Sequence, residues 1–426
     1  MNMAYRSVKT VCSAVQRKAK NLAKDRKGST AIMFAILTPV MIAGLAYGSE
    51  VGGWELSKRK LQNAADTAAF AAGTQLRSGR PESELETAAT LIAGEGGYDT
   101  ATGTLTLASP PVSGAYAGDP NALHLTLRQP IERKFSKLII NDPVYVTVDA
   151  TALVNNGRPA CVLALSPTAS GAVHVQGSTD VDLDGCDVAA NSIASDAINM
   201  QGAAQLEADC LSAVGGVSTT SNLDIDCATP IENGPVTADP YRDRVQPTAG
   251  SCAPNNNAWT KKSGKGKPSP GTYCGGGQIK GTVELDPGVY ILDGGSWKIN
   301  AGADLSGDDV TLFFTGGATI DVNGSADVDL SAPTSGNYAG IVIWFDRADT
   351  GSHKFNGGSG FSVVGAVYGA KSDIEFTGST TGGSAGECTQ IIGYTVKFSG
   401  NSDFDTDCSA SGTSEIRTAQ SINIVE

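Results

Sequence analysis

Histidine, charged residues and aromatic residues are all scarce in this chain. Histidine occurs three times in 426 residues, charged residues make up 18% and aromatic residues 6%. His124, His174 and His353 lie far apart, and no local pattern joins them to a serine, a cysteine or a carboxylate as catalytic and metal sites require. We therefore expect no catalytic residue, no metal and no cofactor, and we expect that the protein is not an enzyme.

The charge that is present is unevenly distributed. Residues 1–27 carry eight lysine and arginine residues against one acid, although the whole chain has a net charge of −13. The acidic remainder argues against nucleic acid as a partner, because phosphate binding needs clustered cations. The 52 glycines, together with the low share of charge, favour a β architecture with many turns.

A run without any charged residue follows the basic tail. Residues 28–49 are uncharged and mostly apolar, which is long enough to cross a bilayer as a helix. Clustered cations on the N-terminal side predict that residues 1–27 stay in the cytoplasm. The body would then lie on the other side of the membrane, anchored by a single pass. A cleaved signal peptide is the alternative, so processing of the N-terminus stays open.

The cysteines are consistent with this topology. Of the nine, Cys12 precedes the apolar run and eight follow it. An even number beyond the membrane indicates a disulfide framework in an oxidising compartment. Connectivity is open, but short loops favour pairing between sequence neighbours: Cys161 with Cys186, Cys210 with Cys227, Cys252 with Cys274, and Cys388 with Cys408.

Residues 50–78 predict an amphipathic helix that continues from the apolar run. Apolar residues recur at three-, four- and seven-residue steps and mark one packing face. Its small alanines permit close packing against a partner helix or a sheet. Residues 79–156 predict a small α+β unit that is pilin-like in outline. The face consists of Val51, Trp54, Leu61, Ala65, Ala68 and Ala72.

From residue 157 to residue 426 the sequence predicts a disulfide-stapled, β-rich domain. Short alternating strands are separated by turn residues, and the segment ending at Cys186 is echoed by those ending at Cys210, Cys227 and Cys408. Repeats at this interval are typical of one coil of a solenoid. We predict a right-handed parallel β-helix or a related stacked-β fold, with a β-sandwich as the alternative. Residues 230–280, rich in proline and lysine, predict an insertion.

Two groups of residues in this domain are candidates for ligands. Asp180, Asp182 and Asp184 match the start of an EF-hand loop, but Asn191 stands where the closing glutamate belongs. We expect these carboxylates to face solvent beside an inward Val181 and Leu183, where a stacked acidic row would hold Ca²⁺ weakly. Trp259, Trp297 and Trp344 are candidates for stacking on sugars, and core packing is the alternative for Trp297 and Trp344, which lie in apolar runs.

Two motifs near the N-terminus carry a family resemblance. Arg26-Lys-Gly-Ser-Thr-Ala-Ile-Met-Phe-Ala-Ile-Leu-Thr-Pro39, followed by Trp54-Glu-Leu-Ser-Lys-Arg-Lys-Leu-Gln-Asn-Ala-Ala-Asp-Thr-Ala-Ala69, resembles the TadE/TadG-like module of the tight-adherence (Tad) system, which assembles Flp pili. The resemblance implies partners among other Tad/Flp pilus-assembly proteins, bound through the N-terminal helix. It also implies a bacterial inner membrane with the body in the periplasm, and the cell surface or a pilus as further destinations. Met33 stands where pseudopilin members carry glutamate, so the resemblance favours the TadG-like branch.

Two functions from different classes follow. The first is a non-enzymatic, membrane-anchored pilus-assembly or minor-pilin-like protein that supports pilus biogenesis, adhesion or envelope anchoring. The second is a glycan-binding or glycan-cleaving β-helix protein of the cell envelope, with a lyase or hydrolase that uses paired carboxylates as its catalytic form. Envelope or surface glycans are candidate ligands in both cases.

Overall fold

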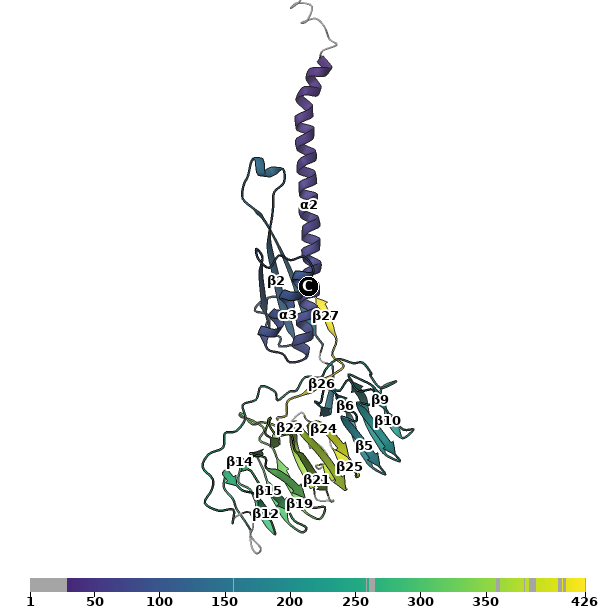
Figure 1. Cartoon of the computed structure of the whole chain (residues 1–426), viewed down its shortest axis with the longest axis vertical. Coiled ribbons are helices and arrows are strands. Elements are labelled where there is room, and N and C mark those ends of the chain that lie inside the picture. The colour runs from purple at the N-terminus through teal and green to yellow at the C-terminus, as the bar shows by residue number, and fades with distance from the viewer. Residues whose placement is uncertain are drawn as a thin grey trace, which may run out of the picture.

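A computed structural model describes residues 29–155, 157–257, 259, 265–357, 361–378, 380–382, 388–404, 408 and 411–425. The basic tail expected at residues 1–27 lies outside the described residues. Figure 1 shows a long helix, a small helix-and-sheet unit beside the end of that helix nearer the body, and a large stacked β body beyond the unit. The solenoid class predicted from the repeats is thereby confirmed, with about 10 turns.

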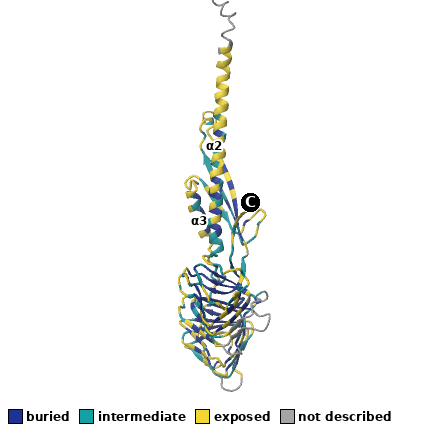
Figure 2. Cartoon of the chain, turned by 90° about the vertical axis from the view of Figure 1, so that its right-hand side faces the viewer, coloured by how far each residue is buried: buried dark blue, intermediate teal, exposed yellow. Residues whose placement is uncertain are grey.

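The long helix is continuous. Helix α2 spans Ser29–Arg77, contains Pro39, and runs through Gly52 and Gly53 without a break. It is long and apolar enough to cross a membrane. Large apolar side chains from Ile32 to Leu45 are exposed, whereas one face is buried from Leu61 onward, a change visible along the helix in Figure 2. The helix therefore has a bare first half and a docked second half.

The docked half packs on a small sheet and a second helix. Helix α3 (Glu82–Glu95) lies against α2, and Gly96 at its end permits this approach, since a Cβ there would lie 2.8 Å from the Cβ of Ala64. Neighbouring strands of the four-stranded sheet pair antiparallel, in the order β1-β2-β3-β27. The 3₁₀ helix η2 (Ser136–Leu138) lies in the β2–β3 connection. The strands are β1 (Thr104–Ala108), β2 (Ala122–Ile131), β3 (Val144–Val154) and β27 (Ile422–Val425).

The fourth strand of this sheet comes from the C-terminus. Ile422 pairs with Val154, and Val425 pairs with Thr151. We expected residues 157–426 to form the β-rich domain, but the structure puts residues 422–425 in the sheet of the helix-and-sheet unit. The open edge of β3 offers unpaired backbone groups, and β27 satisfies them.

The body is a single stack of mostly parallel strands. Twenty-three strands belong to it, and only β26 is antiparallel to its neighbour, β4, among the described strands. The hand of the coil stays a prediction. The first segment contributes β4 (Arg158–Ala164), β5 (Val173–Gly177), β6 (Asp180–Ala190), β7 (Ile198–Gly202), β8 (Gln205–Ala213), β9 (Val217–Ser218) and β10 (Leu223–Ile225).

A second segment supplies the remaining strands. They are β11 (Gly271–Cys274), β12 (Gly277–Ile279), β13 (Thr282–Glu284), β14 (Gly288–Asp293), β15 (Ser296–Ile299), β16 (Asp304–Gly307), β17 (Val310–Thr315), β18 (Thr319–Val322), β19 (Asp327–Ser331), β20 (Ile341–Phe345), β21 (Ser352–Gly357), β22 (Phe361–Gly378), β23 (Thr380–Gly382), β24 (Thr389–Phe398), β25 (Ser402–Phe404) and β26 (Ile416–Thr418). Residues 230–280, expected as an insertion, thus include β11 and β12 of the stack.

The chain enters the stack in its middle. Strand β4 pairs with β6 on one side and with β24 on the other, where Val162 lies opposite Ile391. The first segment winds outward from β4 to β10, and the second starts at the far end with β11 and winds back to β24. The connection between them runs along the body, where Arg347 donates hydrogen bonds to the carbonyls of Tyr241 and Arg244. Entry and exit therefore meet at one place.

At this place the entering and the leaving segment of the chain both connect the body to the helix-and-sheet unit. Asn155 and Ser421 exchange backbone and side-chain hydrogen bonds, with 2.7 Å between Asn155 Nδ2 and Ser421 Oγ. Asp187, fully buried, accepts from Arg158 Nε at 3.0 Å and from the hydroxyl of Thr418. Burial raises the pKa of Asp187, and the bonds from Thr418 and Arg158 partly oppose that rise.

The four cysteine pairs are those between sequence neighbours. The structure joins them across sequence separations of 25, 17, 22 and 20 residues, so each closes about one coil. Cys161 and Cys186 staple β4 to β6, and Cys252 ties the connecting segment to β11 through Cys274. Such cross-links restrict the unfolded chain and so stabilise the stack. The pairs are Cys161–Cys186, Cys210–Cys227, Cys252–Cys274 and Cys388–Cys408.

Candidate functional site

The packing face predicted on the helix is used inside the chain. Leu61, Ala65, Ala68 and Ala72 are buried, together with Ala64 and Ala69, which the sequence pattern left out. They contact the sheet and α3 in one apolar cluster. Val51 and Trp54 are only partly covered, and Arg133 lies 5.5 Å from the Trp54 ring. The predicted face is therefore not free for a partner helix, and most of the large apolar side chains exposed on α2 lie in its bare half.

Glu50 is a candidate positioning residue that the sequence pattern did not single out. It directly follows the uncharged run and is only 3% exposed. Its carboxylate accepts the backbone N–H groups of Lys134 at 2.7 Å and Ser136 at 2.8 Å, and the Ser136 hydroxyl at 3.0 Å. Desolvation raises the pKa of Glu50, but these bonds from Ser136 and Lys134 outweigh it and lower the pKa. The one signal in the sequence was an acid at the end of an apolar helix.

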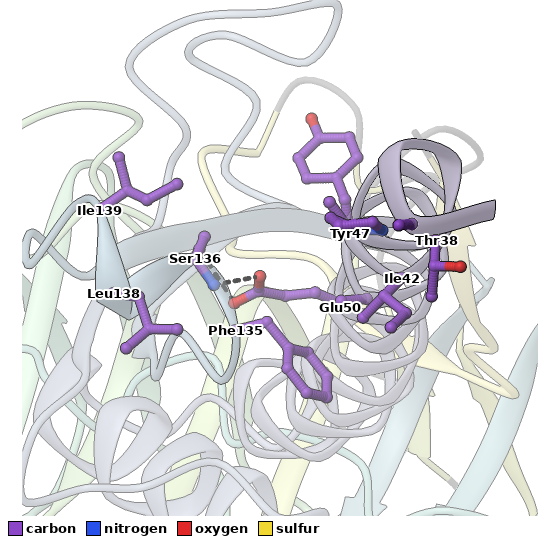
Figure 3. Close-up of a pocket in the computed structure, with 12 residues that line it drawn as sticks. Thr38, Ile42, Tyr47, Glu50, Phe135, Ser136, Leu138 and Ile139 are labelled. Atoms are coloured by element: carbon purple, nitrogen blue, oxygen red, sulfur yellow. Dashed lines mark hydrogen bonds between the residues drawn. The ribbon is translucent and has the colours of Figure 1, made fainter. Parts of the chain in front are cut away.

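The clamped segment is the β2–β3 connection, residues 132–143, called the hairpin tip below. Figure 1 shows it reaching along α2 away from the body. Leu138 and Ile139 on it are 93% and 88% exposed. An apolar hollow of about 990 Å³ lies between the tip and the residues of α2 from Ala35 to Glu50 (Figure 3). An open, apolar hollow beside an exposed apolar helix is typical of a surface that binds lipid or another protein.

One histidine cluster in the body resembles a catalytic set and is not one. Asp349 Oδ2 lies 2.6 Å from His353 Nε2 and accepts from the Ser372 hydroxyl at 3.0 Å. The serine thus bonds to the carboxylate and not to the imidazole, so the serine–histidine contact of a catalytic triad is not formed among these residues. His353 is fully buried and stacks on Phe345 at 3.6 Å, and burial lowers its pKa despite Asp349. The cluster holds two coils together.

The tryptophans do not offer faces to a sugar. Trp259, Trp297 and Trp344 are 1%, 2% and 0% exposed. Trp297 and Trp344 are therefore core residues, as the alternative interpretation had it, and Trp259, expected only as a sugar-stacking candidate, is a core residue too. Trp259 lies edge-on to Trp297 at 5.5 Å and closes the end of the stack that begins at β11. Burying these rings gives the solenoid end an apolar plug.

The described side chains of the acidic row on β6 lie on the outside of the stack. Val181 and Leu183 are buried, while Asp180 and Asp182 lie on the outer face. The Asp184 side chain lies outside the described residues. Within the residues that the structure describes, no three histidine, cysteine, aspartate or glutamate side chains gather closely enough to hold a metal ion. Ca²⁺ binding there stays a prediction.

Comparison with known proteins identifies one part of the chain. Residues 28–75 match the model of the Tad family, described as "Putative Flp pilus-assembly TadE/G-like". The matched residues cover α2 and no strand of the body. Neither the curated proteins nor the solved structures include a match to this chain. The family likeness thus concerns the helix that carries Glu50, the bare apolar half and the docked alanine face.

Proposed function

We propose that this chain is a non-enzymatic, membrane-anchored component of a Tad/Flp pilus-assembly system, of the TadG-like branch. The observation that carries the proposal is that the family match coincides with α2, whose first half is apolar and bare. A helix with exposed apolar residues on all sides needs lipid or other apolar helices around it. Met33, where pseudopilin members have glutamate, supports the TadG-like branch.

The proposed topology puts the basic tail in the cytoplasm and the body in the periplasm. Clustered cations before the apolar run support this orientation. The four disulfides support an oxidising compartment for the body. The long helix and the two segments that connect the body to the helix-and-sheet unit then hold the solenoid away from the bilayer, where it serves as a scaffold or adhesive surface. Because the alanine face is already buried, partners in the pilus machinery contact the bare half of α2.

The glycan-active alternative gains no specific support. The three tryptophans of the body are core residues, and the histidine cluster is sealed. We therefore do not propose glycan binding or glycan cleavage as a second function.

Two variants test the proposal in the bacterium. In the first, residues 50–426 are exported behind a cleaved signal sequence, which keeps the packed alanine face and removes the anchor. We expect pili to be lost, because the body no longer stays at the assembly site. Wild-type pilus numbers, counted by electron microscopy, would overturn the proposal.

The second variant is the matched control. Residues 29–49 are replaced by an unrelated apolar helix of the same length, which keeps the anchor and changes the helix surface. We expect the protein in the membrane fraction but pili still reduced, because the bare half contacts partners. Full restoration of pili would limit the role of this segment to anchoring.

A further inference from the structure

The hairpin tip lies beside the part of α2 that is proposed to span the membrane. The hollow that it encloses is lined on the helix side by Ala35, Pro39 and Ile42 as well as Glu50. At about 1.5 Å of rise per residue, Ile42 lies about 12 Å from Glu50 along the helix. The tip therefore overlaps the part of α2 that would be inside the bilayer, and the inference rests on the proposed anchoring.

The side chains of the tip have the composition of a membrane-interface element. Phe135 is 51% exposed, Leu138 93% and Ile139 88%. The exposed Lys134 and Lys137 flank Phe135 and Leu138, and lysine stems can lie along apolar surface with the ammonium at headgroup level. Figure 3 shows Phe135 and Leu138 beside the clamped Ser136 and across the hollow from Ile42.

Several backbone groups of the tip are satisfied internally, and such bonding is what contact with lipid requires. Glu50 takes the N–H groups of Lys134 and Ser136. The turn of η2 takes the N–H groups of Ile139 and Ile140, both of which donate to the Ser136 carbonyl at 3.0 and 2.9 Å. Arg133 closes the loop by donating to the Asp142 carbonyl at 2.7 Å and to the Ser136 hydroxyl at 3.1 Å. These bonds lower the cost of moving this part of the backbone out of water.

The geometry points to the hairpin tip as a second membrane contact, inserted into the interface of the leaflet nearest the body and held there by Glu50. Its occupant is the lipid surface itself: acyl chains against Leu138 and Ile139, and anionic headgroups against Lys134 and Lys137. Lipid is favoured over a protein partner because the exposed apolar surface is continuous around α2 from Ile32 to Leu45. With two contacts, the body is fixed in tilt and rotation relative to the bilayer.

The test uses the full chain with Cys12→Ser, so that one introduced cysteine carries an environment-sensitive fluorophore. Leu138→Cys probes the tip, and Met41→Cys, 63% exposed on the bare helix, probes the anchor. Val112→Cys is the matched control, 88% exposed in the loop at the other end of β2. The protein is reconstituted into phosphatidylethanolamine–phosphatidylglycerol vesicles with acyl-chain nitroxide as lipid quencher and iodide as aqueous quencher.

We expect the labels at residues 138 and 41 to be quenched by nitroxide and the label at residue 112 by iodide. Iodide quenching at residue 138 with nitroxide quenching at residue 41 would overturn the second contact and leave the anchor intact. Protection at residue 138 from both quenchers would also overturn it, in favour of a protein cover. Absence of nitroxide quenching at residue 41 would contradict the anchor, and the inference with it.

A second variant tests the clamp. Glu50→Ala removes every acceptor for Lys134 and Ser136, so we expect the label at residue 138 to shift from nitroxide towards iodide quenching. Glu55→Ala, an exposed acid on the same helix, is the control and should leave residue 138 unchanged. Unchanged nitroxide quenching in Glu50→Ala would show that the tip enters lipid without Glu50, which would overturn its positioning role.

Discussion

The helix-and-sheet unit and the solenoid build their cores in opposite ways. Around α2 the buried side chains are small: Ala64, Ala65, Ala68, Ala69 and Ala72 let the helix backbone approach the sheet and α3. In the solenoid the interior is filled by larger aliphatic side chains and, in the second segment, also by aromatic rings that repeat from coil to coil. Phe376, for example, stacks between Phe355 at 5.1 Å and Phe398 at 5.9 Å. In the first core, the short distance between backbones limits the size of the side chains. In the second, the side chains must be large enough to fill the volume between the strands.

The largest expected effect comes from emptying the second core. Phe376→Ala removes a fully buried ring from the middle of a stack, and such changes cost about 3–5 kcal/mol. Guanidinium unfolding of the full chain with Trp54→Phe in detergent, followed by the fluorescence of the three buried body tryptophans that remain, measures the loss. Phe70→Ala, 48% exposed on α2, is the control and should change little. A loss in Phe376→Ala no larger than in the control would contradict the comparison.

The opposite change should break the first core. Ala68→Leu adds volume where the backbones are close, and overpacking of this kind costs about 1–3 kcal/mol. Hydrogen exchange of the α3 amides should become faster. Asn63→Leu, exposed on the same helix, is the control and should leave α3 protection unchanged. If Ala68→Leu also lowers the tryptophan-detected stability of the body by the same amount, the two regions unfold as one unit and the distinction fails.

The smallest effect concerns how the two regions hold carboxylates. Glu50 is held mainly by backbone donors, whereas Glu375 on the solenoid lies between Lys397 at 2.9 Å and Lys354 at 3.1 Å, residues aligned on adjacent strands. Partial burial raises the pKa of Glu375, but hydrogen bonds and charge from Lys397 and Lys354 outweigh it and lower the pKa. Because both lysines are partly exposed, we expect Glu375→Gln to cost about 1 kcal/mol or less at pH 7.

The pH dependence of that contribution has a definite sign. A lowered folded pKa means that the stabilisation is present above the unfolded value of 4.5 and is lost as the pH falls through the folded pKa. Tryptophan-detected unfolding of the wild type and Glu375→Gln should therefore converge below pH 4.5. An equal difference between them at pH 7 and pH 3 would show that the lysine pairs do not stabilise the ionised form.

Local patterns in the sequence were sufficient for several features. The uncharged run at residues 28–49, the alternating strands at 122–127 and 144–154, and the cysteine-containing repeats each depend on residues close together in the chain. Helical and strand periodicity is a local property, so the membrane-length helix and the solenoid class follow from it. The buried face of α2 was predicted only in part, because Ala64 and Ala69 lie where helix α3 and the sheet meet it from two sides.

The sequence by itself determined the kind of elements: an apolar helix of bilayer length, a Tad-like helix segment, and a cysteine-stapled stack of short strands. Only the tertiary structure decided how they are joined. The entry of the chain into the middle of the stack, the pairing of β27 with β3 and the clamp of Ser136 on Glu50 all link residues far apart in sequence. Backbone donors and acceptors carry no residue-specific signal, so such partners are chosen by proximity in the folded chain.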